Sequence, residues 1–135
     1  MAVLSLEIIT PEKVLVNEDV DMVEASGALG EFGILPGHRQ FLTILEVGEV
    51  RYTKGATTTS LATSGGVGEV VDDKVTFLLD TGEFAEDIDL ARAQLALEEA
   101  QEKLKDLSIE TAEYRKQELA LLRALARIKV ASGRS

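Results

Sequence analysis

Hydrophobic and polar residues alternate in short runs through the first 85 positions of the chain. Leu4, Leu6 and Ile8 alternate with polar neighbours, and Thr10-Pro11 then ends the run. A period of two is typical of a half-buried β-strand. Further strands are expected at 14–16, 20–24, 47–54, 67–71 and 74–80, at the short apolar run 42–45, and at the threonine-rich run 57–63, which suits an edge or a wet face. Because no helical pattern separates these strands, about eight to ten in all, the sequence predicts an antiparallel β-sandwich or barrel.

Two segments rich in glycine or aspartate mark turns between these strands. Residues 27–38 hold four glycines and one proline among apolar residues, which favours a run of turns joining two strands. A phosphate-binding loop is excluded, because the spacing fits neither G-x-G-x-x-G nor a loop ending in Gly-Lys-Ser/Thr, and no helical pattern follows. Asp72-Asp73 is expected to form a two-residue hairpin turn.

The hydrophobic period changes to three or four near residue 87, which predicts a helix. Asp87 or Asp89 can cap the start of this helix, because a short acidic side chain accepts hydrogen bonds from the first free amides. Its apolar seam is expected at Leu90, Ala93, Leu97, Ala100, Leu104 and Leu107.

A second helix is expected to follow after a short connection. Ser108 is its candidate N-cap, and the helix is expected to run to about Val130. Its seam is expected at Leu119, Leu122 and Ala126. Because the connection is short, the two helices should form an antiparallel hairpin. The sequence therefore predicts two domains, a β-sandwich at 1–86 and a helical hairpin at 87–135.

Composition excludes several classes of protein. The 135 residues include no cysteine and one histidine, and the formal net charge is −10. A disulfide framework and a multi-histidine metal site within one chain are therefore excluded. The acidic body disfavours nucleic acid and anionic lipid as partners. No signal peptide or membrane-spanning run is recognisable, which predicts a soluble protein.

The positive charge is concentrated near the C-terminus. Residues 114–135 hold six Lys or Arg against one Asp or Glu, and Arg123 and Arg127 are four apart and so share a helix face. Two interpretations are open: a basic face in solvent that offsets the acidic first helix, or a helix that leaves its partner and binds an acidic surface elsewhere. Alanines in the first seam fit the second interpretation, because Leu–Ala contacts bury less apolar area than Leu–Leu contacts.

No catalytic constellation is recognisable in the sequence. His38 has no second imidazole for a metal site, and no serine lies in a nucleophile-elbow motif. The scattered carboxylates are interpreted as a solvated surface. We therefore expect a non-catalytic protein with no metal and no required cofactor, in which His38 belongs to a contact loop.

Several motifs, in their order along nearly the whole chain, resemble the epsilon subunit of F-type ATP synthases. They are Gly30-Glu31-Phe32-Gly33-Ile34-Leu35-Pro36-Gly37-His38, then Ser64-Gly65-Gly66 before Glu69-Val70, and then the helical hairpin. The sequence departs from many members at Arg39-Gln40-Phe41, where they have Ala-Pro-Leu. The resemblance implies a mainly β plus α fold, with an N-terminal antiparallel β-sandwich and a C-terminal antiparallel helical hairpin.

The resemblance also implies a function and its partners. The chain would be a non-catalytic rotor subunit of the central stalk, coupling rotation of the c ring to the catalytic head through the gamma subunit. Glu31 and His38 would touch the polar loops of the c ring. The extended hairpin would inhibit ATP hydrolysis by meeting the catalytic alpha and beta subunits through Arg115, Arg123 and Arg127. Only the complex would hold the protein at a membrane, on the cytoplasmic face of the bacterial plasma membrane or at a thylakoid.

One further motif concerns regulatory ATP. Residues 88–93, Ile-Asp-Leu-Ala-Arg-Ala, are similar to a motif of bacterial members that bind ATP with the hairpin folded down. The implied site residues are Asp89, Arg92, Arg123 and Arg127. Glu99 stands where strong binders carry arginine, so weak binding is expected. The alternative is that Asp89 and Arg92 form only a helix cap and an intrahelical pair.

A second class of function stays open at this stage. The chain could be a free-standing β-sandwich that binds a small ligand or sugar, with a helical dimerisation tail. Such a module needs aromatic residues along a groove, and the whole chain has only four Phe, two Tyr and no Trp. Co-purification with a gamma subunit would separate the two classes.

Overall fold

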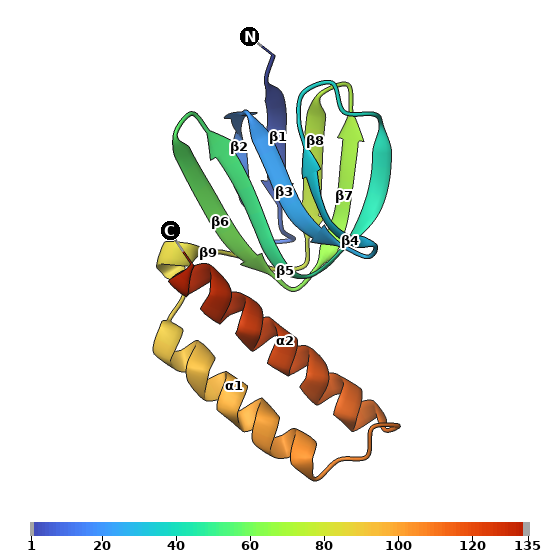
Figure 1. The fold of residues 1–135 in the computed structure, drawn as a ribbon, viewed down its shortest axis with the longest axis vertical. Coiled ribbons are helices and arrows are strands. Elements are labelled where there is room, and N and C mark those ends of the chain that lie inside the picture. The colour runs from blue at the N-terminus through green and yellow to red at the C-terminus, as the bar shows by residue number, and fades with distance from the viewer. Residues whose placement is uncertain (1, 134–135) are drawn as a thin grey trace.

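The alternating runs form nine β-strands within residues 2–133, the part of the chain described by the computed structural model (Figure 1). The strands are β1 (Leu4–Ile9), β2 (Val14–Val20), β3 (Met22–Gly27), β4 (Gly30–Ile34), β5 (Phe41–Lys54), β6 (Thr57–Thr63), β7 (Gly66–Val71), β8 (Lys74–Leu79) and β9 (Gly82–Phe84). A short 3-10 helix, η1 (Ala85–Asp87), leads into the helices α1 (Leu90–Lys105) and α2 (Ala112–Ser132).

The strands are hydrogen-bonded in the order β2-β1-β8-β7-β5-β3-β4, and β6 and β9 extend the sheet from β5. β5 joins the two layers of the sandwich, because residues 41–45 pair with β7 and residues 48–54 pair with β6. The predicted antiparallel β-sandwich is confirmed. Among the described strands the β1–β8 pair alone is parallel, and it joins segments too distant in the chain for a local turn signal to indicate it.

The strand β5 replaces two shorter strands expected at 42–45 and 47–54. Its 14 residues form one continuous strand, with no turn between the two predicted runs. A shift in the pairing with β3, between Ala25 and Gly27, marks the place where the sheet bends.

The segment 27–38 holds a strand that the sequence did not predict. β4 pairs with β3 across the Ala28-Leu29 turn. Gly30 has a φ of +117°, which favours glycine. Ile34 is fully buried and Phe32 packs against the core, so alternate residues of β4 anchor it. The expectation of turns alone was incomplete, because glycine within a strand has the same sequence signal as glycine in a turn.

Asp72 and Asp73 form the predicted two-residue turn between β7 and β8. Their φ values are +49° and +63°, and a type I′ turn requires positive φ at both positions. The Asp73 carbonyl also accepts a hydrogen bond from the Ser5 amide at 2.8 Å, and its Oδ1 accepts one from the Gly37 amide at 2.7 Å. The turn thereby anchors both β1 and the loop that follows β4.

The two helices begin at side-chain caps. Asp89 Oδ1 accepts a hydrogen bond from the Arg92 amide at 3.1 Å, as expected for α1. The expected cap of α2 was wrong, because Thr111 and not Ser108 accepts from the Tyr114 amide, also at 3.1 Å. Ser108 lies in the connection, and its carbonyl accepts from the Thr111 amide at 3.0 Å.

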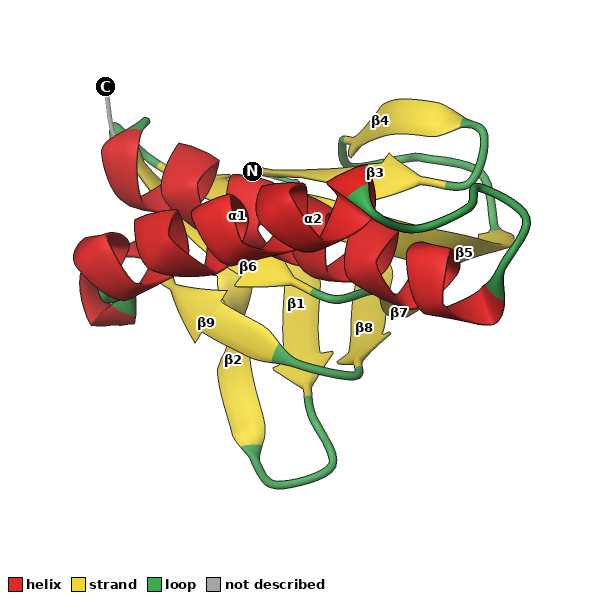
Figure 2. Ribbon diagram, turned by 90° about the horizontal axis from the view of Figure 1, so that it is seen from below, coloured by secondary structure: helices red, strands yellow, loops and turns green. Residues whose placement is uncertain are grey.

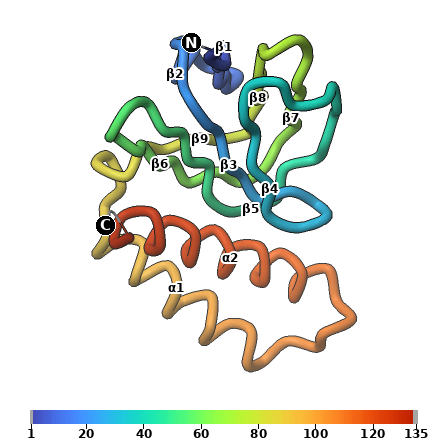
Figure 3. Tube along the Cα trace, turned by 45° about the horizontal axis from the view of Figure 1, so that its top comes forward, coloured from blue at the N-terminus to red at the C-terminus, as the bar shows by residue number. Residues whose placement is uncertain are grey.

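The helices pack as the predicted antiparallel hairpin, and α2 lies between α1 and the sandwich (Figure 3). Ala93 and Ala100 of the predicted α1 seam are buried. The expected α2 seam was wrong at Leu122, which is 41% exposed. The buried residues of α2 are Gln117, Ala124, Ala126 and Val130. Ala126 was expected in the seam, whereas Gln117, Ala124 and Val130 were not, because α2 has neighbours on two sides and a one-seam pattern describes only one of them.

The hairpin lies across one end of the sandwich, as the view from below shows (Figure 2). α2 contacts β5, β6 and η1 there. Within residues 2–133, no helix is long and apolar enough to cross a membrane.

Candidate functional site

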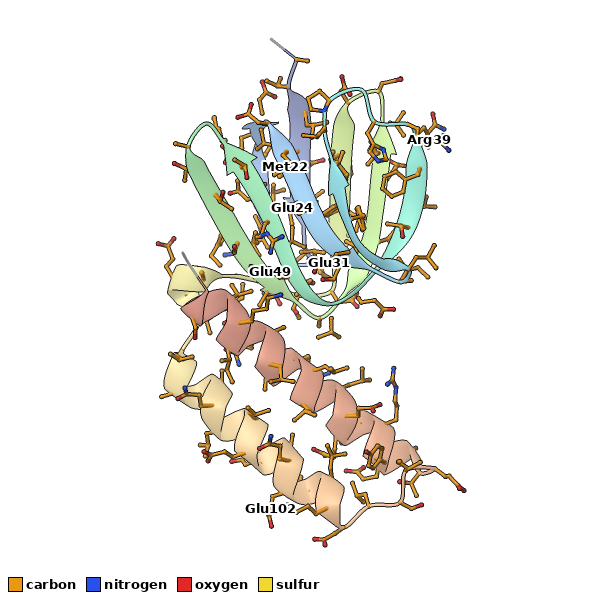
Figure 4. The ribbon with its side chains drawn as sticks, viewed as in Figure 1. Met22, Glu24, Glu31, Arg39, Glu49 and Glu102 are labelled. Carbon is orange, nitrogen blue, oxygen red and sulfur yellow. The ribbon has the colours of Figure 1, made fainter. Side chains whose placement is uncertain are left out.

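Glu31 and His38, expected on one contact loop, lie apart in the structure. Glu31 belongs to β4, and its side chain is 65% exposed. His38 follows β4; its Nδ1 lies 2.8 Å from the Arg39 carbonyl oxygen and its ring centre lies 5.0 Å from that of Phe41. Figure 4 places Glu31 near the helices and Arg39 toward the other end of the sandwich. A surface that touched both residues would therefore run along the edge strand β4.

Arg51 forms a cluster with three carboxylates of β3, β4 and β5, namely Glu24, Glu31 and Glu49, which Figure 4 labels. Its Nη2 lies 3.1 Å from Glu24 Oε2 and 3.9 Å from Glu31 Oε1, and its Nη1 lies 3.0 Å from Glu49 Oε1. The hydrogen bond to Glu24 raises the pKa of the Arg51 guanidinium, burial lowers it by less, and the charge of Glu49 raises it further. Arg51 therefore stays charged. Sequence reasoning missed this cluster because strand register alone brings Glu24 opposite Arg51.

Two ion pairs join α2 to the sandwich. The Arg127 guanidinium contacts Glu83 of β9 through both carboxylate oxygens, with Nε at 2.8 Å from Oε1 and Nη2 at 3.1 Å from Oε2. Lys129 Nζ lies 3.7 Å from Glu49 Oε1, and the Glu49 side chain is only 9% exposed. A forked arginine–carboxylate pair is the stronger geometry of the two.

The apolar contact between the two parts is small. Ala62 of β6, Ile88 and Val130 form its buried cluster, with Ala85 and Ala131 packed against it. The main core of the sandwich contains no residue of either helix. The hairpin therefore rests on the sandwich through small side chains and two ion pairs.

The four residues implied as an ATP site are brought together only in part. Arg123 and Arg127 line a hollow of about 50 Å³ together with Thr63, Ser64, Thr81 and Glu83. Asp89 and Arg92 lie outside this hollow, in the first turn of α1, and Asp89 acts as the N-cap. The hollow is far smaller than the roughly 300–1,000 Å³ of ordinary ligand sites. The Arg127 guanidinium is already hydrogen-bonded to the Glu83 carboxylate, which would compete with a phosphate group for it.

The three arginines expected on the inhibitory helix also have different surroundings. Arg115 is 64% exposed and contacts Glu118 of the same helix at 2.7 Å. Arg127 is held by Glu83, and Arg123 lies beside that pair in the small hollow. In this pose, Arg115 alone of the three lies clear of the sandwich-facing hollow.

A row of apolar side chains crosses the outer face of the other layer. The strand register places them side by side on five neighbouring strands, and we call them the outer apolar row: Val14, Ile9, Leu78, Val67 and Ile44. Val14 and Leu78 are each 52% exposed, and Ile44 is 62% exposed. Leu42, on the same face of β5, is 69% exposed. A contiguous apolar surface of this kind is a candidate protein-binding face.

Sequence reasoning missed the outer apolar row, although a signal was present. Ile44-Leu45 and Leu78-Leu79 are adjacent apolar residues on strands, so one member of each pair must point away from the core. In each pair the second residue is buried at 2% exposure and the first is exposed.

A larger hollow of about 710 Å³ lies beside β6 and η1. Its lining includes Arg51, Thr58, Ser60, Glu86 and one aromatic ring, Phe84. Arg51 is already engaged by carboxylates, and a single ring does not make the aromatic groove that a sugar-binding module needs.

Two protein families match the chain in consecutive stretches. Residues 3–85 match the family "ATP synthase, Delta/Epsilon chain, beta-sandwich domain", and residues 86–132 match "ATP synthase, Delta/Epsilon chain, long alpha-helix domain". The ATP synthase epsilon chain of Geobacter metallireducens is 51% identical over 95% of this chain and 93% of its own length. That of Geotalea daltonii is 50% identical over 97% of this chain and 96% of its own length.

Solved structures are similar over the same extent. A chain of the Euglena gracilis mitochondrial ATP synthase (OSCP, F1 and c-ring) superposes with a TM-score of 0.84 at 25% identity, covering 93% of this chain and 79% of that one. A chain of the central stalk and c-ring of the Tetrahymena thermophila mitochondrial ATP synthase has a TM-score of 0.62 at 14% identity, covering 98% of both chains. The second likeness concerns the fold alone.

Proposed function

The chain belongs to the ATP synthase epsilon-chain family and is a non-catalytic subunit, and we propose how its parts serve that complex. The sandwich anchors the subunit in the central stalk, between the gamma subunit and the c ring. The hairpin is a movable arm that restrains ATP hydrolysis by the alpha and beta subunits when it extends. The complex holds the subunit at the cytoplasmic face of the bacterial plasma membrane.

The outer apolar row supports gamma as the partner of the sandwich. Its exposed side chains lie on five strands of one rigid layer, so they form a pre-organised surface. A stalk subunit has to stay bound while it transmits torque, and burial of apolar area provides the largest stabilisation for such a permanent contact.

The edge strand β4 supports the contact with the c ring. It is the last strand of its layer, and it presents Glu31 at one end and leads to His38 at the other. Both side chains are polar, as suits a partner with polar loops. The Asp73–Gly37 hydrogen bond fixes the loop that carries His38.

The observation that carries the proposed arm is the independence of the two cores. No residue of α1 or α2 belongs to the main sandwich core, and the contact between the parts is built mainly from alanine. A small interface of this kind permits relative movement. The cations of α2 suit an acidic surface on the catalytic subunits once the arm extends.

A chain that ends after Asp87 is expected to separate the two roles. It should remain folded, because the main core lies within residues 4–84. We expect it to bind gamma and support coupled ATP synthesis, and to lose all restraint of hydrolysis. The full-length chain is the control, and the measurements are circular dichroism, reconstitution and ATPase rate. An unfolded fragment, or inhibition that survives the truncation, would contradict the proposal.

Regulatory ATP is expected to bind weakly, in the millimolar range. Glu83 occupies Arg127, and Glu99 adds a negative charge to α1. At about 8 Å and an effective dielectric constant of about 20, one unit charge interacts with phosphate by roughly 2 kcal/mol. Salt and solvent reduce this value, so Glu99→Arg should tighten binding by about tenfold.

Calorimetry on the isolated subunit measures this affinity. Glu102→Arg is the matched control, because Glu102 lies on the same helix and is 76% exposed. Micromolar affinity of the unaltered chain would contradict the expectation. Equal tightening by both variants would show that net charge, and not a site near Glu99, determines binding.

A further inference from the structure

The Arg127–Glu83 and Lys129–Glu49 pairs connect the two parts of the chain, whereas the other ion pairs of the hairpin stay within one helix. Lys105 pairs with Glu102 in α1, and Arg115 pairs with Glu118 in α2. The two connecting pairs lie near the C-terminal end of α2, two residues apart, where the helix meets β9 and β5.

The connecting pairs are partly removed from solvent. The side chains of Arg127 and Glu83 are 29% and 36% exposed, and that of Glu49 is 9% exposed, whereas Lys129 remains 63% exposed. The pairs within a helix are more exposed, at 69% and 76% for Lys105 and Glu102 and 64% and 40% for Arg115 and Glu118. Because screening by water and salt falls with burial, the Arg127–Glu83 pair stabilises its contact more than an exposed pair does, and the longer Lys129–Glu49 pair, with its exposed lysine, contributes less.

Glu49 and Glu83 differ in whether a paired cation remains when α2 leaves the sandwich. Glu49 keeps Arg51 at 3.0 Å, so its charge stays compensated. Within residues 2–133, Arg127 is the one cation that is paired with Glu83. Glu83 is therefore the carboxylate that is left without a paired cation when the helix leaves the sandwich.

We propose that Glu83 and Glu49 form an electrostatic latch that holds the hairpin on the sandwich, and that Glu83 competes with any other acidic surface for Arg127. The small cluster of Ala62, Ile88 and Val130 fixes where the helix end rests, and the latch sets how long it stays. The competition part rests on the proposed inhibitory arm, whereas the latch itself is a property of the isolated chain.

If Glu83 competes for Arg127, substitutions of Glu83 and of Arg127 should have different effects on inhibition. Glu83→Gln weakens the folded pose alone, so it should favour extension and strengthen inhibition of the assembled enzyme. Arg127→Gln removes a contact from both poses, so it should loosen the hairpin without strengthening inhibition. A purely structural ion pair would give the same result for both variants.

The pose can be measured on the full chain because it contains no native cysteine. Thr57→Cys on β6 and Lys116→Cys on α2 place two spin labels at exposed positions, and pulsed electron resonance gives the distance between them. Glu83→Gln is expected to increase the long-distance population about fivefold to tenfold, and Lys129→Gln about twofold. Glu102→Gln is the matched control and should change nothing.

Charge reversal provides a rescue test. Glu83→Arg alone should open the hairpin, and Glu83→Arg combined with Arg127→Glu should restore the short distance. An unchanged distance distribution in Glu83→Gln, or a double reversal that stays as open as the single one, would overturn the latch. A shift of pose with unchanged inhibition of the complex would uphold the latch and contradict the proposed inhibitory arm.

Discussion

Replacement of both Val67 and Leu78 by lysine is expected to abolish stable assembly with the gamma subunit while the sandwich stays folded. The two side chains are neighbours in the outer apolar row and are 39% and 52% exposed. Burial of each large apolar side chain contributes about 1.5–3 kcal/mol, and lysine adds the cost of an unpaired charge at the contact. The loss of affinity should be at least about a hundredfold.

Size-exclusion chromatography with gamma and a titration of binding would measure this loss. Leu95→Lys and Ile109→Lys make the same change on the hairpin, at positions that are 55% and 74% exposed. These controls should bind gamma normally. If the double variant also binds normally while its melting temperature is unchanged, the outer apolar row is not the gamma contact.

The Gly66→Ala substitution is expected to destabilise the sandwich by at least about 3 kcal/mol. Gly66 lies between Leu45 of β5 and Leu79 of β8, and its φ is +158°. A Cβ there would overlap the carbonyl oxygen of Leu78 and lie 2.9 Å from Leu79 Cα. Because both contacts are with backbone, relief requires that two strands separate. The melting temperature should fall by about 10 °C or more.

Gly33→Ala is the matched control for this experiment. Gly33 also lies in a strand, but a Cβ there would meet Glu24 Cγ at 3.9 Å, which is an ordinary contact. Thermal unfolding of this variant should differ little from that of the unaltered chain. Equal melting temperatures for Gly66→Ala and Gly33→Ala would show that the β7–β8 contact yields without cost.

Local patterns predicted a large part of this fold. The threonine-rich run 57–63 and the run 67–71 match β6 and β7 to within one residue. The Asp72-Asp73 turn and the Asp89 cap were also correct. Each of these features depends on a few consecutive residues, because turn dihedrals and cap hydrogen bonds close within three or four positions.

The errors arose where a neighbour far along the chain decides the structure. β4 forms because β3 pairs with it, and Ile34 then reaches the core. Leu122 was expected to be buried but is exposed, because α2 packs against both α1 and the sandwich and its buried faces differ from a single seam. The sequence analysis placed the α2 cap at Ser108, whereas the helix begins three residues later with Thr111 as its cap.

For the candidate sites, too, the sequence predicted which residues are involved but not how they lie relative to one another. The sequence motifs led to Glu31, His38 and the arginines of α2, because residue type and order carry a family resemblance. They could not show that Glu31 lies toward the helices while Arg39, the neighbour of His38, lies toward the other end of the sandwich, or that Glu83 holds Arg127. Those relations join residues up to 44 positions apart.

By itself the sequence determined the strand and helix periods, the charge division between body and tail, and the membership of a family. Only the tertiary structure decided which faces are free and which charges are paired. The outer apolar row exists because the register of five strands aligns one side chain from each. A shift of one residue in strand register would place each of these side chains on the other face. The register between strands that are distant in the chain cannot be predicted from a local sequence pattern.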